Sequence, residues 1–249
     1  MRRWMMLAEA SAPAGMLQQT FYHGTSNEER GRNILEQGII PGNQNVKARG
    51  HLLPIAGRSY LTSDLRYGVI YCIGGDMLGC SPESAQYLVK KNSRHEAASQ
   101  YGWLFVISGQ NLLNDIQPDE DSVGAFLADH TERGWDQSTK PWRPLPRKFK
   151  PDGVEDDFKA RVWHNIRHSM TDKQFRDAVE GQISAQASGG KRALKRLTDH
   201  DKLALIRWGA HVAYQGTLIP DQAWRFDKLK TPELEKDGSN FFGLAEQLR

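Results

Sequence analysis

The sequence contains little cysteine, and its two cysteines form no motif. Cys72 and Cys80 are the only cysteines among 249 residues, and neither belongs to a CxxC pair. No second Cys/His pair has the spacing of a zinc site, so the sequence predicts neither a disulfide framework nor a structural metal. Two reduced thiols are typical of a reducing compartment. A chain of this length buries enough apolar surface for a large domain without such cross-links.

Long hydrophobic runs are also absent. Arg2 and Arg3 precede a short apolar run at residues 4–8, an arrangement similar to a signal peptide, but Glu9 interrupts the run too early for one. We therefore expect residues 1–19 to form an N-terminal arm. No other stretch approaches the apolar length of a membrane span, so we expect a cytoplasmic protein with no membrane partner.

The charge balance excludes a histone-like excess of basic residues. The 33 Lys and Arg against 30 Asp and Glu give a net charge of +3, which permits a nucleic-acid partner without requiring one. Basic residues gather with aromatics at residues 140–150, and further basic residues lie at 191–196. We interpret both stretches first as solvated surface, with contacts to a nucleic acid as the alternative.

The order of the predicted elements indicates an α+β fold. Strands are predicted at residues 20–23, 59–62, 102–108, 211–215, 218–220 and 223–226. Helical patterns dominate about 125–205. Strands at both ends of a helical middle predict one domain over residues 20–249, with a mostly helical insertion at about 125–205.

A helix is predicted between the first two strands. Ser26 and Glu29 fit a capping box with Ser26 as the N-cap. Ile34 and Leu35 would point inward, and Gly38 is a residue suited to end the helix.

Polar side chains lie at the ends of the first two predicted strands. His23 can hydrogen-bond a sugar hydroxyl through either ring nitrogen, and Gly24 would let a ligand approach the backbone closely. Tyr60 can stack on a flat heterocycle such as nicotinamide. Each residue alone is more typical of a structural strand-end or core residue, so a functional interpretation depends on the two motifs together.

Together these motifs resemble those of the diphtheria-toxin-type ADP-ribosyltransferases, a superfamily that includes the poly(ADP-ribose) polymerases and the RNA 2′-phosphotransferases. The matching segments are Tyr22–Ser26 (YHGTS), Ile34–Pro41 (ILEQGIIP) and Tyr60–Thr62 (YLT), followed by a helix that contains Tyr71. The resemblance covers roughly residues 20–125 and 205–227, and it leaves the helical insertion out.

The resemblance implies a core of two packed small β-sheets with flanking helices, and NAD⁺ as a co-substrate. His23 would bond a ribose hydroxyl, and the backbone of Gly24 would hold the nicotinamide amide. Thr25 would line the adenosine side. Tyr60 would stack on the nicotinamide, with Tyr71 on the second wall. Cleavage of the N-glycosidic bond would pass through an oxocarbenium-like state.

The sequence departs from this family at the third site position, which is usually a glutamate on a late strand. The matching stretch, residues 211–215 (HVAYQ), contains no acid. His211 and Gln215 share one face of a regular strand. His211, which we favour, could also act as a base, whereas Gln215 could only hydrogen-bond. Asp221 follows a proline and is expected in a turn, and an acid from elsewhere in the chain is a further alternative.

We therefore expect a mono-ADP-ribosyltransferase that releases nicotinamide and modifies a protein or a nucleic acid. Without the glutamate, elongation of a polymer is not expected. An RNA 2′-phosphotransferase-like enzyme on the same fold is one alternative. A non-catalytic module that binds NAD⁺ or ADP-ribose is another. A toxin or a phage effector would suit a small enzyme of this kind.

Overall fold

The structure is a computed structural model, and it describes most of the predicted β-rich segments. The described residues are 19–42, 57–74, 81–112, 116–119, 126, 135–136, 143–144, 156–168, 171, 173, 195, 197–209, 211–230, 233–235 and 237–249. Residues 1–18 of the expected arm, Cys80 and nearly all of both basic stretches lie outside this set.

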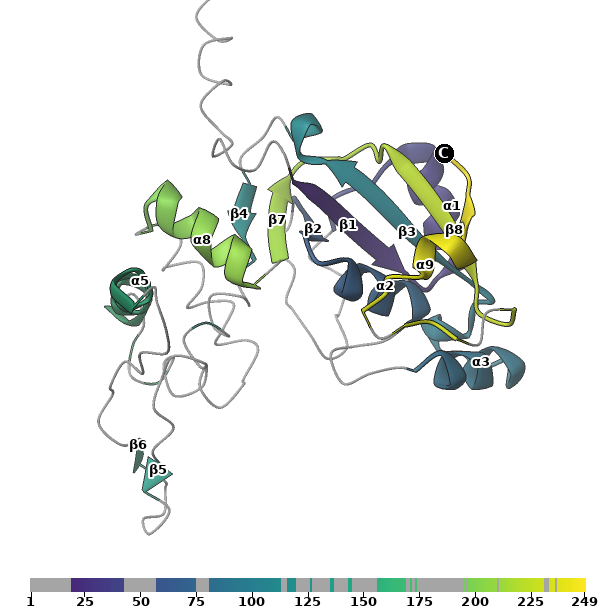
Figure 1. Cartoon of the computed structure of the whole chain (residues 1–249), viewed down its shortest axis with the longest axis horizontal. Coiled ribbons are helices and arrows are strands. Elements are labelled where there is room, and N and C mark those ends of the chain that lie inside the picture. Colours follow the sequence, from purple (N-terminus) through teal and green to yellow (C-terminus); the bar gives the residue numbers. More distant parts are fainter. Residues whose placement is uncertain are drawn as a thin grey trace, which may run out of the picture. The chain divides into compact units, whose positions relative to one another are not determined.

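The central feature is a seven-stranded sheet with the order β4-β7-β2-β1-β3-β8-β9 (Figure 1). Its strands are β1 Thr20–Thr25, β2 Arg58–Thr62, β3 Tyr101–Ser108, β4 Ile116–Pro118, β7 His211–Gln215, β8 Gln222–Asp227 and β9 Glu246–Gln247. The pairings β1–β2, β1–β3, β3–β8 and β8–β9 are antiparallel. β5 Trp135–Asp136 and β6 Arg143–Pro144 form a separate two-stranded ribbon.

The described α-helices occur in both the N-terminal and the C-terminal half of the chain. They are α1 Glu28–Gln37, α2 Leu65–Ile73, α3 Pro82–Lys90, α5 Asp156–His168, α8 Asp199–Gly209 and α9 Phe241–Leu244, with 3-10 turns at Glu96–Ala98 and Gly109–Asn111. Within the described residues, none of the helices has the length and apolar character needed to cross a membrane.

The α+β class is confirmed, but the sheet differs from the expected pair of small packed sheets. β1 pairs with β2 on one side and with β3 on the other, so the described ladder runs on through β8 to β9 as one sheet. The strand predicted at 218–220 is reduced to a single bridge between Leu218 and Ile39. An ADP-ribosyltransferase core stays an expectation.

The chain divides into two compact units. The first unit comprises residues 1–42, 57–116 and 214–249, and the second comprises residues 43–56 and 117–213. The boundary passes through β4 and β7, so part of each strand belongs to each unit. The helical segment expected at about 125–205 falls within the second unit, and its status as an insertion in a single domain stays a prediction.

The helix α1 begins one residue later than predicted. Its N-cap is Asn27, whose Oδ1 accepts a hydrogen bond of 2.8 Å from the backbone N–H of Arg30. The capping box with Ser26 as its cap is therefore wrong. Asparagine caps a helix as well as serine does, and the hydroxyl of Thr25 accepts the Asn27 N–H at 3.3 Å, which helps to place Asn27 at the start of the helix.

The end of α1 lies where the sequence predicts it. Gly38 has φ of 84°, and its N–H donates to the carbonyl of Ile34. A Cβ at Gly38 would lie 2.6 Å from the Leu218 carbonyl oxygen. Glycine is therefore suited both to the positive φ at the helix end and to the close bridge to residue 218.

The helix α2 lies against the sheet through glycines. A Cβ at Gly24 of β1 would lie 2.1 Å from the Gly68 carbonyl oxygen of α2. A Cβ at Gly102 of β3 would lie 1.9 Å from the Cys72 carbonyl oxygen, and at Gly68 it would lie 2.9 Å from the Tyr22 Cβ. Without side chains at these positions, the backbone of α2 comes into direct contact with the two central strands.

The opposite face of β3 is covered by α1, which Figure 1 shows behind the sheet, with α2 in front. A Cβ at Gly31 would lie 2.2 Å from Cδ1 of Trp103. The rings of Trp103 and Phe105 stack with centroids 6.1 Å apart and planes at 9°. Because alternate side chains of a strand point to opposite faces, Leu104 lies instead on the α2 side, in the main apolar core.

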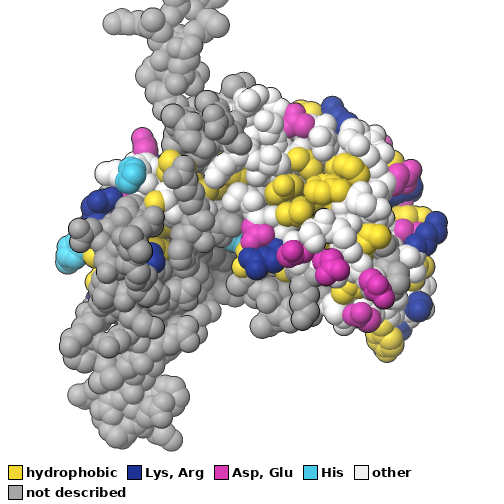
Figure 2. Space-filling model, viewed as in Figure 1, with side chains coloured by type: hydrophobic (Ala, Val, Ile, Leu, Met, Phe, Trp, Pro, Cys, Tyr) yellow, Lys and Arg dark blue, Asp and Glu magenta, His cyan; other side chains and the backbone are white. Residues whose placement is uncertain are grey.

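That core fills the space between the sheet and the helices α2, α3 and α9. Its buried members are Val69, Cys72, Ile73, Ala85, Leu104, Phe226 and Phe241. Tyr22, Trp224 and Phe242 pack against it and are only partly buried. Figure 2 shows hydrophobic side chains reaching the surface on this side of the first unit.

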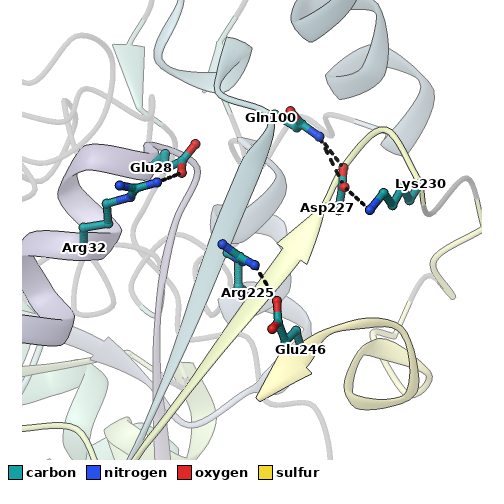
Figure 3. A network of polar contacts seen from close by, with 7 residues as sticks. All are labelled: Glu28, Arg32, Gln100, Arg225, Asp227, Lys230 and Glu246. Carbon is teal, nitrogen blue, oxygen red and sulfur yellow. Dashed lines mark hydrogen bonds and ion pairs between the residues drawn. The ribbon is translucent and has the colours of Figure 1, made fainter. Parts of the chain in front are cut away.

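The edge of the sheet is tied together by polar contacts (Figure 3). Arg225 of β8 forms an ion pair of 2.5 Å with Glu246 of β9, and its guanidinium lies 4.6 Å from the ring centroid of Tyr101. Asp227 accepts a hydrogen bond of 3.2 Å from Gln100 and pairs with Lys230 at 3.6 Å. One partner of each ion pair is mostly buried and the other is exposed, and partly exposed pairs of this kind contribute only modest free energy.

Gly102→Ala tests the backbone contact between α2 and β3. Its new Cβ would overlap a backbone oxygen that cannot turn away, so we expect the free energy of unfolding to fall by about 1–3 kcal/mol or more. Urea denaturation measures this change. Gly243→Ala is the matched control, because a Cβ there meets nothing within 4 Å. Equal stability of the two variants would contradict the contact.

Candidate functional site

The predicted NAD⁺-site residues of the first two motifs lie on the central strands of the first unit and on α2. His23, Gly24 and Thr25 form the end of β1, and Tyr60 lies on the neighbouring strand β2. Tyr71 lies on α2, and its Cβ is 2.8 Å from the position that a Cβ of Gly24 would take. The fold therefore gathers the two motifs and the second tyrosine around the end of β1.

The imidazole of His23 is held by the backbone of the adjacent strand. Its Nδ1 lies 2.9 Å from the carbonyl oxygen of Tyr60. A carbonyl only accepts hydrogen bonds, so the ring proton is assigned to Nδ1 and the lone pair to Nε2. In this tautomer, Nε2 can accept a hydrogen bond from a sugar hydroxyl.

Burial keeps this imidazole uncharged. It lowers the pKa of His23 below the ordinary value of 6.5, while the bond to the Tyr60 carbonyl acts in the opposite direction. The guanidinium of Arg30 lowers the pKa further, because two cations repel. At neutral pH the side chain is thus a hydrogen-bond acceptor and not a cation.

The two tyrosines differ in exposure. Tyr60 is half-buried and lies between the buried residues Ser59 and Leu61 of β2. Tyr71 is 38% exposed. A half-buried ring and an exposed ring near one strand end are suited to contact a flat heterocycle from two sides.

Gly24 and Thr25 have structural tasks that the sequence did not reveal. The missing side chain of Gly24 makes room for α2, so packing alone requires glycine at this position. Thr25 is only 5% exposed, and its hydroxyl accepts the N–H of Asn27. The predicted contacts of Gly24 with nicotinamide and of Thr25 with adenosine stay predictions.

Lys228 holds the turn that follows these residues. Its ammonium group donates hydrogen bonds to the carbonyls of Ser26 at 3.1 Å and Ala97 at 3.2 Å, and the residue is 1% exposed. A buried charge is costly unless it is hydrogen-bonded, so the two carbonyls and the lysine depend on each other. Local sequence does not indicate this role, because Lys228 stands in a polar stretch (DKLK) typical of a solvated turn.

The two candidates for the third site position belong to different units. His211 is half-buried and lies on the part of β7 that belongs to the second unit. Gln215 is exposed and lies on the part that belongs to the first unit, with His23 and Tyr60. Asp119, which is 5% exposed, donates its backbone N–H to the carbonyl of His211 at 3.1 Å. It is a buried acid next to β7 that the sequence analysis did not select.

Asp221 belongs to the framework. One of its carboxylate oxygens accepts the backbone N–H of Ser108 at 2.6 Å, and the other accepts the side-chain amide of Asn111. It lies just before β8, outside the strands. These bonds anchor the turn after β3 and make Asp221 a poor candidate for the missing acid.

Cys72 has the character of a core residue. Burial raises the pKa of its thiol to about 12, although the ammonium group of Lys228 acts in the opposite direction. A protonated thiol is a poor nucleophile. Cys72 therefore offers no covalent chemistry to the site.

No protein-family model, curated protein or solved structure matches this chain.

The neutral state of His23 can be tested by its titration. Because burial lowers the folded-state pKa below 6.5, the unfolded chain binds the proton first as the pH falls. The stability that His23 contributes is complete above the unfolded pKa and is lost as the pH falls through the folded one. NMR titration of the imidazole signals, assigned with His23→Gln, should give a midpoint below 6.5. A midpoint at or above that value would contradict the assignment.

Lys228→Met tests the anchor of the turn. The substitution keeps the length of the side chain but removes the donor to two carbonyls, so we expect the free energy of unfolding to fall by about 1–3 kcal/mol. Lys230→Met is the control, because its side chain is 80% exposed and its ion pair is long at 3.6 Å. Chemical denaturation should leave the control within about 0.5 kcal/mol of the wild type. A similar loss in both variants would contradict the anchor.

Proposed function

We propose that the chain is an NAD⁺-dependent mono-ADP-ribosyltransferase that modifies a protein or a nucleic acid. The observation that carries this proposal is the imidazole of His23, whose Nδ1 is fixed by the Tyr60 carbonyl, so that the acceptor lone pair is assigned to Nε2. The adjacent glycine and the nearby Tyr60 and Tyr71 support it, because they supply backbone and aromatic surfaces for a dinucleotide.

In the proposed complex, His23 orients the substrate. Its Nε2 accepts a hydrogen bond from a ribose hydroxyl of NAD⁺, and the two tyrosine rings hold the nicotinamide between them. Orienting the leaving ring and the sugar in this way removes much of the entropic cost of the reaction. Because burial lowers the pKa of the His23 imidazole and so disfavours the protonated ring, its role is to bind and not to abstract a proton.

The transfer itself breaks one bond and forms one. The bond between C1′ of the ribose and the nicotinamide nitrogen breaks, and its electron pair leaves with the ring as neutral nicotinamide. Positive charge develops at C1′, as in other glycosyl transfers. A nucleophilic atom of the acceptor then bonds to C1′ and loses its proton.

Two residues, His211 and Gln215, are candidates for assisting the attack of the acceptor on C1′. A neutral imidazole at 211 would accept the proton of the acceptor, whereas the amide at 215 would only hydrogen-bond the sugar. Asp119 is a third candidate, because a carboxylate can act as a base and its backbone N–H bonds the carbonyl of His211. The three variants His211→Ala, Gln215→Ala and Asp119→Asn separate these assignments.

The experiment measures the transfer of ADP-ribose and the release of nicotinamide in the same reaction. The purified chain is incubated with NAD⁺ labelled in the adenosine part and with cell lysate, and label is measured in the protein and nucleic-acid fractions beside free nicotinamide. We expect label in one fraction, which identifies the class of acceptor. His23→Ala and Tyr60→Ala should each lower the rate roughly a hundred-fold, because misplaced reacting groups cost about that much.

Two exposed residues provide matched controls. His95→Asn changes an exposed imidazole, and Tyr87→Ala removes a tyrosine that is 62% exposed. Both should retain the wild-type rate. Binding of NAD⁺ without release of nicotinamide would overturn the enzymatic activity and leave a binding module. Absence of both binding and release would overturn the whole proposal. Release of a cyclic ADP-ribose phosphate from 2′-phosphorylated RNA would instead identify a phosphotransferase.

A further inference from the structure

Two histidines lie side by side on the surface of the second unit. His164 and His168 are four residues apart on α5, and both are exposed. Their ring centroids are 4.1 Å apart, with planes at 68°. Figure 2 shows histidine side chains at the surface in the region where Figure 1 draws α5 and α8.

The spacing suits two ligands of a single metal ion. Residues at i and i+4 lie on one face of a helix, about 5–6 Å apart at Cβ. Zinc–imidazole bonds of 2.0–2.1 Å in tetrahedral geometry place the two nitrogens about 3.3 Å apart. Ring centroids 4.1 Å apart place the ring nitrogens within range of this separation. Helical histidines at this spacing also hold Zn²⁺ in metalloproteases.

The positive charge of Arg161 repels a cation at the two histidines less strongly than the basic composition of α5 suggests. Arg161, one turn before His164, donates two hydrogen bonds of 3.0 and 2.8 Å to the carboxylate of Asp201. The side chain of Asp201 is fully buried, with 0% exposure. The guanidinium charge is therefore largely offset by a carboxylate that belongs to α8.

The helix provides a rigid support for the pair. Val162 is fully buried, and Trp163, next to His164, is 7% exposed, so this face of α5 packs into the second unit. The ion pair between Arg161 and Asp201 joins α5 to α8. The two histidines therefore lie on the outer face of a packed helix. Because the helix backbone is already ordered, less conformational entropy is lost when both rings bind one ion.

We propose that His164 and His168 form a binding site for a divalent transition-metal ion, Zn²⁺ or Cu²⁺, with solvent in the remaining coordination positions. No group of three or more His, Cys, Asp or Glu side chains suited to a metal lies within the described part of the chain. The site is accordingly an open, two-imidazole site. Residue 165 between the ligands is asparagine, so the pair lacks the catalytic glutamate of a metalloprotease. Affinity should follow the order Cu²⁺ above Zn²⁺.

The test titrates the full chain with Zn²⁺ or Cu²⁺ alone and measures binding by isothermal titration calorimetry. The wild type should bind one ion more than the double variant His164→Ala/His168→Ala. Each single variant should lose on the order of a hundred-fold in affinity at this site, because the second imidazole binds intramolecularly. Unfolding temperature should rise with metal in the wild type more than in the variants.

His95→Asn is the control for loss of an exposed imidazole elsewhere, and it should leave the extra site intact. Circular dichroism verifies that the variants keep their helices. Equal stoichiometry and affinity in the wild type and the double variant would overturn the site. A single variant that retains full affinity would also overturn it, because chelation needs both rings. Neither readout involves NAD⁺, so the result is independent of the proposed transferase activity.

Discussion

The structure of the first unit depends on a direct backbone contact between α2 and the central strands β1 and β3. Gly24, Gly68 and Gly102 leave no side chains between the helix and the sheet, and a Cβ at any of them would meet an atom within 3 Å. The contact fixes how far α2 stands from the sheet. It therefore also fixes where Tyr71 lies relative to the end of β1, and the core residues of α2 pack around it.

The candidate site is built from polar contacts between segments far apart in the chain. His23 is held by a carbonyl 37 residues later, and the turn after it is held by Lys228, 202 residues from Ser26. Both contacts satisfy buried polar groups in a region of low dielectric, where an unpaired group would be costly. Burial and the carbonyl act against each other on the pKa of His23, with burial the larger effect. The outcome is a neutral ring with a defined acceptor atom.

The second unit contains the two histidines of the proposed metal site. The ion pair between Arg161 and the buried Asp201 fastens α5 to α8 and leaves the two histidines on the outer face of α5. Breaking such a pair would leave a carboxylate without its partner inside the unit. The proposed metal site thus rests on an interaction that also organises the helices beneath it.

The sequence by itself determined the order and type of the main elements in the described part of the chain. Aromatic and β-branched residues predicted β3, alternation predicted β7, the glycine at 38 predicted the end of α1, and the HGT motif placed His23 at a strand end. These features depend on local backbone preferences and side-chain periodicity. Tertiary structure decided what local rules cannot predict: the seven-stranded sheet, the packing role of Gly24 and the burial of Lys228. The reason is physical, because each of these depends on atoms that distant segments supply only after the chain has folded.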